Sequence, residues 1–526
     1  MDAKSLAIKI IFLVVFFAVM IIIGVMTRKK ANSVEGFVLG GRTAGPWLTA
    51  FGYGTSYFSA VVFIGYAGQF GWKYGVASTW IGIGNAVIGS LLAWIVLGRR
   101  TRVMTKHLNS KTMPEFFGKR FDSKALRIAA ALISFIFLIP YTSSVYNGLS
   151  RLFNMAFNID YKVCIIVMAA LTCVYVILGG YMATVVNDFV QGIIMLFGIT
   201  AVVFSVLNNN GGFIGALTTL SQTPSDLPVT EGMQGAFTSF FGPDPLNLLG
   251  VIVLTSLGTW GLPQMVGKFY AIKDEKSVKA GTIISTIFAF VVAGGCYFLG
   301  GFARLYSGNP AIYKEDGSVL FDSIIPTMLQ NLPDILVGVV IVLVLSASMS
   351  TLSSLVLTSS STVTLDLIEQ IKPKANEDKK KKEKTQLITM RLLLIFFIAV
   401  SVFLSLNPPT FIAQLMGYSW GALAGAFLAP FLWGLYWKRT TKISVWVCFI
   451  FGVGFTVANM LFKFIASPIN AGAVTMLAGL VIVPIVSLIT PKLAKDKVDG
   501  IFSCYDETVT IEKRYSLPEN APAGEE

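Results

Sequence analysis

The residues of this chain that could do chemistry lie inside long apolar segments. Asp188 is the only acid in segment 183–207. A carboxylate inside a membrane is costly, so it usually faces a charged partner or an ion path. A cap at a helix end or a structural salt bridge remains an alternative, because Asp188 lies only a turn or two from the end of its segment.

A second group is the hydroxyl-rich stretch from Ser346 to Ser354. Ser350, Ser353 and Ser354 are spaced i, i+3, i+4 and share one helical face, with Thr351 beside them. Hydroxyl oxygens are neutral hard ligands that suit a hard cation once a carboxylate supplies charge. Small serines also allow close helix packing or bond back to carbonyls, so the spacing alone leaves ion binding and packing equally open.

Other kinds of site are excluded by the residues that are missing. His107 is the single histidine, and none of the five cysteines forms a C-x-x-C pair, so a His-based metal site and a Ser-His-Asp triad are ruled out. The sequence has no Gly-x-x-x-x-Gly-Lys-Ser/Thr motif for binding nucleotide phosphates. We therefore expect neither an enzyme nor an ATP-driven pump.

The elements that position these residues are membrane spans. Of the 526 residues, 54% are hydrophobic and 13% charged, whereas soluble domains carry about 25% charged residues. Runs of about 20 apolar residues match a bilayer core. We predict an all-α integral membrane protein with thirteen spans, centred on residues 10–27, 45–70, 76–98, 128–157, 162–179, 183–207, 246–270, 280–303, 334–368, 389–406, 411–437, 443–463 and 471–490.

The loops between these spans alternate in charge. Basic residues gather in every second loop, as the positive-inside rule requires, at 28–42, 99–127, 273–279, 379–382 and 438–442. This predicts a multi-pass protein of the cell (inner) membrane with its N-terminus outside and its C-terminus in the cytoplasm. The formal net charge of +13 therefore needs no nucleic-acid partner. Membrane lipid is the expected surrounding, and the oligomeric state stays open.

Two segments are unusual for membrane helices. Residues 45–70 contain Gly52 and Gly54, and residues 246–270 contain Gly258, Gly261 and Pro263. Glycine and proline weaken helices, so both segments should break near the middle of the membrane. Each is the first of five successive spans, and interrupted helices at matching places in two halves point to a transporter's binding site. Close helix packing is the alternative reason for the glycines.

Several motifs together resemble the sodium:solute symporter family over roughly residues 8–490. They are Phe37-Val-Leu-Gly-Gly-Arg42, Ile177-Leu-Gly-Gly180, Asn187-Asp-Phe-Val-Gln-Gly192 and Met349-Ser-Thr-Leu-Ser-Ser354 ahead of Asp366-Leu. Val186–Met195 and Gly261-Leu-Pro-Gln264 look most like the pantothenate/proline branch.

The resemblance implies a five-plus-five inverted-repeat (LeuT-like) core with broken first and sixth core helices. The expected parts are an N-terminal extra span and loop (1–44), the first repeat (45–207), an extracellular loop (208–245), the second repeat (246–437), two extra spans (438–490) and a cytoplasmic tail (491–526). We expect short helices in the long loops 208–245 and 304–333, a solvated linker at 372–384, and a weakly ordered tail.

The resemblance also implies one or two coupling Na⁺ ions. One would be held by backbone carbonyls of Thr55 and Phe58, the carbonyl of Ala347 and the hydroxyls of Ser350 and Thr351. A second would use Asp188, Ser350, Ser353 and Ser354. The residues expected near the substrate are Tyr57, Tyr141, Thr259, Trp260, Gln264 and Tyr418, with packing as the alternative role for each.

These features predict a sodium-coupled symporter that imports a small organic acid, amino acid or vitamin-like carboxylate by alternating access. The chain departs from the sodium/proline symporters at Tyr57, where they have aspartate, and at Thr255 and Thr259, where they have Trp and Tyr; these differences argue against proline. The alternatives are a proton-coupled or uncoupled carrier, a channel or sensor of the same fold, and a sugar as substrate.

Overall fold

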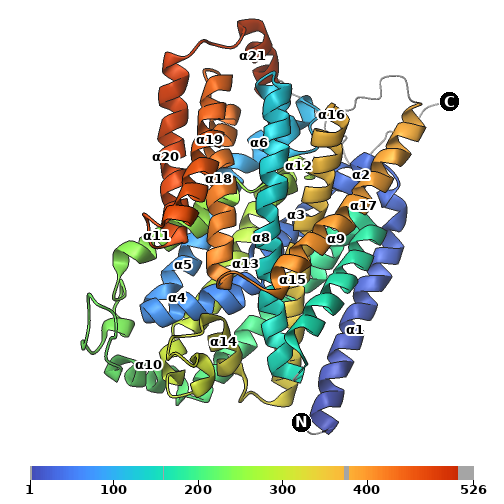
Figure 1. The fold of residues 1–526 in the computed structure, drawn as a ribbon. Coiled ribbons are helices and arrows are strands. Elements are labelled where there is room, and N and C mark those ends of the chain that lie inside the picture. The colour runs from blue at the N-terminus through green and yellow to red at the C-terminus, as the bar shows by residue number, and fades with distance from the viewer. Residues whose placement is uncertain (1–2, 158, 372–377, 507–526) are drawn as a thin grey trace, which may run out of the picture.

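The computed structural model describes residues 3–157, 159–371 and 378–506, and within them the chain is helical (Figure 1). These residues form two isolated β-bridges but no strand. The long helices, in chain order, are α1 (Ala3–Thr27), α8 (Lys124–Phe157), α9 (Tyr161–Asn208), α13 (Glu275–Gly300), α15 (Asp334–Thr362), α17 (Lys379–Leu406), α18 (Ile412–Tyr436), α19 (Lys442–Phe462) and α20 (Pro468–Ile489). The predicted all-α class is confirmed.

Shorter helices connect the long ones. They are α2 (Val34–Leu39), α3 (Pro46–Tyr57), α4 (Ala67–Tyr74), α5 (Thr79–Gly84), α6 (Arg99–His107), α7 (Met113–Arg120), α10 (Gly212–Gln222), α11 (Pro245–Leu257), α12 (Pro263–Tyr270), α14 (Phe321–Leu329), α16 (Glu369–Ile371) and α21 (Lys495–Phe502). Helical turns of wider, π-type winding occupy Val61–Tyr66, Asn85–Leu92, Trp94–Gly98 and Val363–Ile368.

Within the described residues, ten helices are long and apolar enough to cross a membrane, or eleven if α11 and α12 form one bent span. All thirteen predicted spans fall on helical segments. Two pairs of predicted spans share a helical stretch: 45–70 and 76–98 meet in residues 61–107, and 162–179 and 183–207 both lie in α9, on either side of its kink. The kink in α9 is at Gly180, whose φ of 54° is one that L side chains rarely adopt.

The first broken helix is α3 with its continuation through α4. The helix α3 begins with Pro46 at its first turn and ends at Tyr57, and Phe58 is extended with φ −104° and ψ 92°. Gly54 is required here, because a Cβ atom would lie 2.4 Å from the Phe288 ring. The end of a helix leaves carbonyls without helical donors, so this break presents oxygen atoms in the interior.

The second broken helix joins α11 to α12 with a bend of 42°. Pro263 supplies no backbone donor and stands at the start of α12. The two broken helices are tied together where α3 begins and α12 ends, by a bridge in which the Ala44 amide donates to Ala271 at 3.3 Å and the Lys273 amide donates to Ala44 at 3.0 Å.

The helix α15 is the central scaffold. Every residue from 340 to 357 is buried, and α15 packs against α8 and α9 (Figure 1). By contrast, α1 lies on the outside of the molecule and exposes large apolar side chains such as Ile11, Val14 and Met26, as expected of a helix that faces lipid.

One end of the molecule, the top in Figure 1, carries α6, α12 and α21, and we call it the basic end. The long loops at the opposite end carry the expected short helices α10 and α14. The expectation of a weakly ordered tail is wrong for residues 495–506, because α21 is held by the Lys438–Asp499 ion pair at 2.7 Å and by Arg120 over the Phe502 ring. Residues 372–377 of the predicted linker lie outside the described residues, and so do residues 507–526 of the tail. Lys379–Lys384 belong to α17 rather than to a linker.

Candidate sodium and substrate site

A cluster of hydroxyl groups joins the end of α3 to the middle of α15. The Ser350 hydroxyl donates to Thr55 Oγ1 at 2.7 Å, and Ser354 and Ser56 share a hydrogen bond at 2.9 Å. The Thr351 hydroxyl lies 3.2 Å from the Ser56 carbonyl and 3.1 Å from the Ala347 carbonyl. All of these side chains are buried.

The predicted first sodium ligands therefore lie together. Thr55 and Phe58 stand at the break, and Ala347, Ser350 and Thr351 face it from α15. Oxygen atoms from hydroxyl and carbonyl groups are the donors that a hard cation takes. The serine face of α15 thus lies against the break of α3.

The predicted second sodium site has a different arrangement. Asp188 Oδ2 accepts a hydrogen bond from Lys268 Nζ at 3.2 Å, and both side chains are buried. Ser354 bonds to Ser56, and the Ser353 hydroxyl is directed to the Ser350 carbonyl at 2.9 Å. Of the three predicted serine ligands, Ser350 is the one that lies near the Asp188 carboxylate.

Lys268 is the main polar residue that the sequence analysis missed. It is the only charged residue in segment 246–270. A lone base in a membrane span is costly in the same way as a lone acid, so the position of Lys268 in an apolar segment already marked it in the sequence.

An aromatic cluster, formed by Tyr57, Tyr141 and Trp420, lies beside the break in α3. The Tyr57 ring stacks on Phe58 with centroids 4.3 Å apart and lies 6.3 Å from the Trp420 ring. Tyr141 meets Trp420 edge-on at 5.9 Å. The Tyr57 hydroxyl donates to the Thr255 carbonyl at 2.5 Å and so links the two broken helices. Tyr57 and Tyr141 thus come together, and Trp420 is a further member that the sequence analysis did not name.

The other predicted substrate residues are placed differently. Thr259 and Trp260 donate to the carbonyls of Gly89 and Ile88, at 3.2 and 3.0 Å. Both polar atoms of the Gln264 amide are buried and have no hydrogen-bond partner among the described residues. Tyr418 is half-buried. Trp420, two residues later in α18, is the residue that contacts the aromatic cluster.

A small cavity opens near these residues at the basic end. Its volume is about 40 Å³, which is room for a few water molecules at roughly 10–15 Å³ each. Gln264, Lys268, Ser354, Lys111 and Met113 are among the residues that line it. The buried amide of Gln264 therefore borders a space that water can enter.

Comparison with known proteins decides the family. The model of the sodium:solute symporter family matches residues 37–452. The chain belongs to this family. It is therefore a sodium-coupled symporter of a small organic solute, a multi-pass membrane protein and not an enzyme.

Its similar relatives are bacterial transporters. The osmoregulated proline transporter OpuE of Bacillus subtilis is 29% identical over 495 residues, covering 92% of this chain and 96% of the relative. The sodium/proline symporter of Staphylococcus aureus is 29% identical over 439 residues, which is 82% of each protein. The predicted likeness to the proline branch is confirmed.

Solved structures support the fold. A substrate-bound, outward-open Na⁺-coupled sialic acid symporter superposes with a TM-score of 0.72 at 17% identity, covering 93% of this chain and 99% of that one. Mhp1, a nucleobase-cation-symport transporter in a closed conformation, gives 0.53 at 13% identity, covering 88% and 97%. These similarities confirm the predicted LeuT-like architecture.

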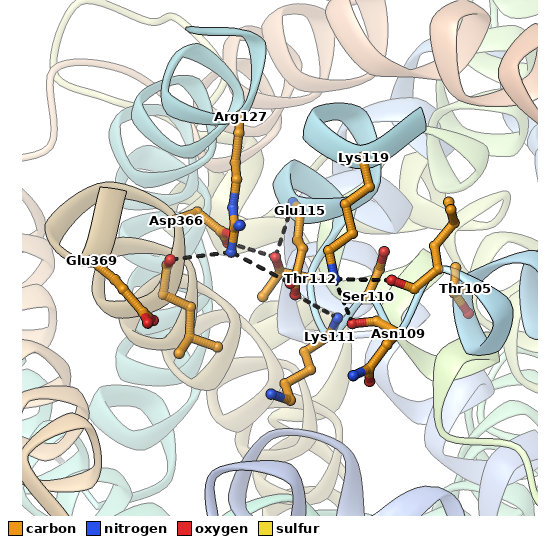
Figure 2. Close-up of polar contacts among 12 residues, drawn as sticks. Thr105, Asn109, Ser110, Lys111, Thr112, Glu115, Lys119, Arg127, Asp366 and Glu369 are labelled. Atoms are coloured by element: carbon orange, nitrogen blue, oxygen red, sulfur yellow. Dashed lines mark hydrogen bonds and ion pairs between the residues drawn. The ribbon is translucent and has the colours of Figure 1, made fainter. Parts of the chain in front are cut away.

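The basic end of this symporter is held by a network of buried charges (Figure 2). Asp366, in the π-type turn Val363–Ile368 that follows α15, accepts from Arg127 Nε at 2.6 Å and from the Thr112 hydroxyl at 2.5 Å. Glu115 lies 3.5 Å from Arg127 Nη2 and 2.9 Å from Lys119 Nζ. Since Thr112 also lines the small cavity, the network fixes one wall of the opening at the basic end.

The opposite end has a larger polar cavity of about 340 Å³. Arg151, Lys314 and Asp322 line it together with Tyr161 and Phe411. Burial raises the pKa of the Asp322 carboxyl to about 6, although the positive charge of Arg151 acts in the other direction.

Proposed function

We propose that this symporter binds one coupling Na⁺ in the hydroxyl cluster between α3 and α15 and carries a small amino acid, imino acid or similar carboxylate. The observation that carries the proposal is the contact of Ser350 with Thr55 at 2.7 Å, beside the Thr351 hydroxyl and the Ala347 carbonyl. The cluster joins the interrupted helix α3 to the buried helix α15.

Sodium in this cluster would order the break of α3 against α15. The aromatic cluster of Tyr57, Tyr141 and Trp420 lies beside the same break. An ion that fixes the break therefore also fixes the position of Tyr57 in this cluster. Coupling of this kind is reciprocal, so the substrate must tighten sodium binding by the same factor as sodium tightens substrate binding.

The proposed substrate class follows from the aromatic cluster and from Gln264. The aromatic rings suit a compact apolar body, and a free amide can donate to a carboxylate and accept from an ammonium group. Two relatives are named for proline. Because Tyr57, Thr255 and Thr259 differ from the residues expected of sodium/proline symporters, we propose a related amino acid or carboxylate rather than proline itself.

We further propose that the basic end faces the cytoplasm, with the N-terminus outside and the C-terminus inside. The excess of Lys and Arg at this end supports that orientation. The small cavity beside Gln264 would then be the start of the inward path. A membrane potential would drive sodium inward with about 2.3 kcal/mol per charge for each 100 mV.

The test is ligand-dependent thermal stabilisation of the purified protein, followed by uptake in proteoliposomes. A panel of amino acids, small carboxylates, vitamins and sugars is compared in sodium and in potassium. We expect an amino acid or carboxylate to raise the melting temperature in sodium but not in potassium, and to accumulate against its gradient. Equal stabilisation in both salts, with uptake that follows pH, would instead support proton coupling. Stabilisation by a sugar alone would overturn the proposed substrate class.

A further inference from the structure

The ion pair between Asp188 and Lys268 lies in the interior of the transporter. Asp188 belongs to the second half of α9, and Lys268 belongs to α12, the second half of a broken helix. Their side chains are 0% and 3% exposed and approach to 3.2 Å. Two buried charges at this distance neutralise one another, which is the usual condition for placing charges in an apolar interior.

The backbone of α3 is shaped to admit this pair. A Cβ atom on Gly52 would lie 3.2 Å from Asp188 Oδ2 and 3.5 Å from Lys268 Nζ. A glycine at this position therefore leaves space for both charged groups against the broken helix. The pair is thus packed against the helix that carries Thr55 of the hydroxyl cluster.

The surroundings of the pair supply no second charge. In the described part of the chain, Lys268 is the one cation within ion-pair distance of Asp188. The other recorded neighbours are neutral: the Tyr181 ring lies 5.6 Å from Lys268 Nζ, and the Ser350 hydroxyl faces Asp188. No described residue forms a hydrogen bond with Asp188 Oδ1.

We propose that the Lys268 ammonium is the resident cation of Asp188 and excludes sodium from this carboxylate, so that the symporter binds one sodium ion rather than two. This inference deepens the proposed function and rests on it for the sodium site in the hydroxyl cluster. Lys268 fixes the number of ions and is not itself a ligand of the ion that is carried.

The electrostatic reason is the balance of charge in the interior. The Lys268 ammonium already neutralises the Asp188 carboxylate, so a sodium ion at this carboxylate would meet a like charge at close range. The hydroxyl cluster instead offers a sodium ion the carbonyl and hydroxyl oxygens of α3 and α15. Removal of the ammonium charge would leave the Asp188 carboxylate without a counterion, and a sodium ion could then bind to it, next to Ser350.

The test counts sodium ions bound to the purified, full-length protein by equilibrium dialysis with ²²Na⁺ in a potassium buffer. We expect saturation at one ion for the wild type and at two ions for Lys268→Gln. Lys268→Arg keeps the positive charge and should stay at one ion. The double variant Lys268→Gln/Asp188→Asn should return to one ion, because the freed carboxylate is gone.

Each outcome decides the proposal. Two ions in the wild type, or one ion in a folded Lys268→Gln protein, would overturn the role of Lys268 while leaving the hydroxyl-cluster site intact. No sodium in the wild type would instead overturn the proposed function. If Lys268→Gln does not fold, Asp188→Asn in the wild-type background decides: a count that stays at one supports Lys268 as the resident cation, and a count that falls from one to zero contradicts it, because the single ion would then depend on Asp188.

Discussion

Arg127 Nε donates to Asp366 Oδ1 at 2.6 Å and thereby joins the start of α8 to the π-type turn that follows α15 (Figure 2). The Asp366 side chain is fully buried, and Arg127 is 15% exposed. Loss of one partner from such a pair leaves the other charge uncompensated, which typically costs about 3–5 kcal/mol. This network therefore stabilises the basic end in the conformation described.

The first prediction follows from this pair. Arg127→Met should lower the free energy of unfolding by about 3 kcal/mol, because the buried Asp366 carboxylate keeps only the Thr112 hydroxyl. Thermal unfolding of the purified protein measures the loss. The control is Lys497→Met, which removes an exposed ion pair with Asp122 and should change stability by no more than about 1 kcal/mol. Equal effects of the two variants would contradict the structural role of the buried pair.

The hydroxyl cluster carries the second prediction. Ser350→Ala removes a ligand of the proposed sodium ion and should weaken sodium affinity about tenfold, or about 1.4 kcal/mol. The control is Ser348→Ala on the same helix, since the Ser348 hydroxyl bonds back to the Val344 carbonyl at 2.6 Å and takes no part in the cluster. Sodium titration of thermal stability measures both variants. A sodium affinity that is unchanged in Ser350→Ala would remove this serine from the site.

Much of this architecture is present in the sequence because a bilayer imposes simple rules. Apolar runs predicted the helices, and glycine and proline predicted both interruptions. The break at Phe58 and the start of α12 at Pro263 lie where those residue types indicated. Helix interruptions are local properties of the chain, so a single sequence contains them.

The pairing of residues across the fold could not be predicted in the same way. Asp188 was recognised as a lone acid, but its contact with Lys268, 80 positions away, depends on how α9 and α12 pack. The choice between Tyr418 and Trp420 depends on the rotation of α18, because residues two apart lie on nearly opposite faces of a helix. Only the packed structure shows that Trp420 faces Tyr57 and Tyr141.

The third prediction concerns Gln264, whose amide atoms are buried beside the small cavity without partners. Gln264→Met keeps a similar length and removes these unsatisfied groups. The variant should be as stable as the wild type or slightly more stable, by up to about 1 kcal/mol, since an unpaired buried polar group costs free energy. Substrate affinity should fall about tenfold, while sodium binding without substrate stays unchanged. Parallel thermal-shift titrations with sodium and with the transported solute separate the two effects.

The fourth prediction is a pH dependence that comes from Asp322 in the cavity at the opposite end. Burial raises the pKa of this carboxyl from 3.8 to about 6 in the folded protein. Because the folded pKa exceeds the unfolded value, protonated Asp322 favours the folded state below about pH 4, and this stability is lost as pH rises through 6. The full effect of about two pKa units is roughly 3 kcal/mol. Asp322→Asn should therefore raise the melting temperature at pH 7.5 and leave it nearly unchanged at pH 4.

The matched control is the exposed Glu315→Gln in the same loop. If Asp322→Asn lowers stability at pH 7.5, the ionised carboxylate is instead stabilised by Arg151 and Lys314 across the cavity, and the sign of the predicted dependence is reversed.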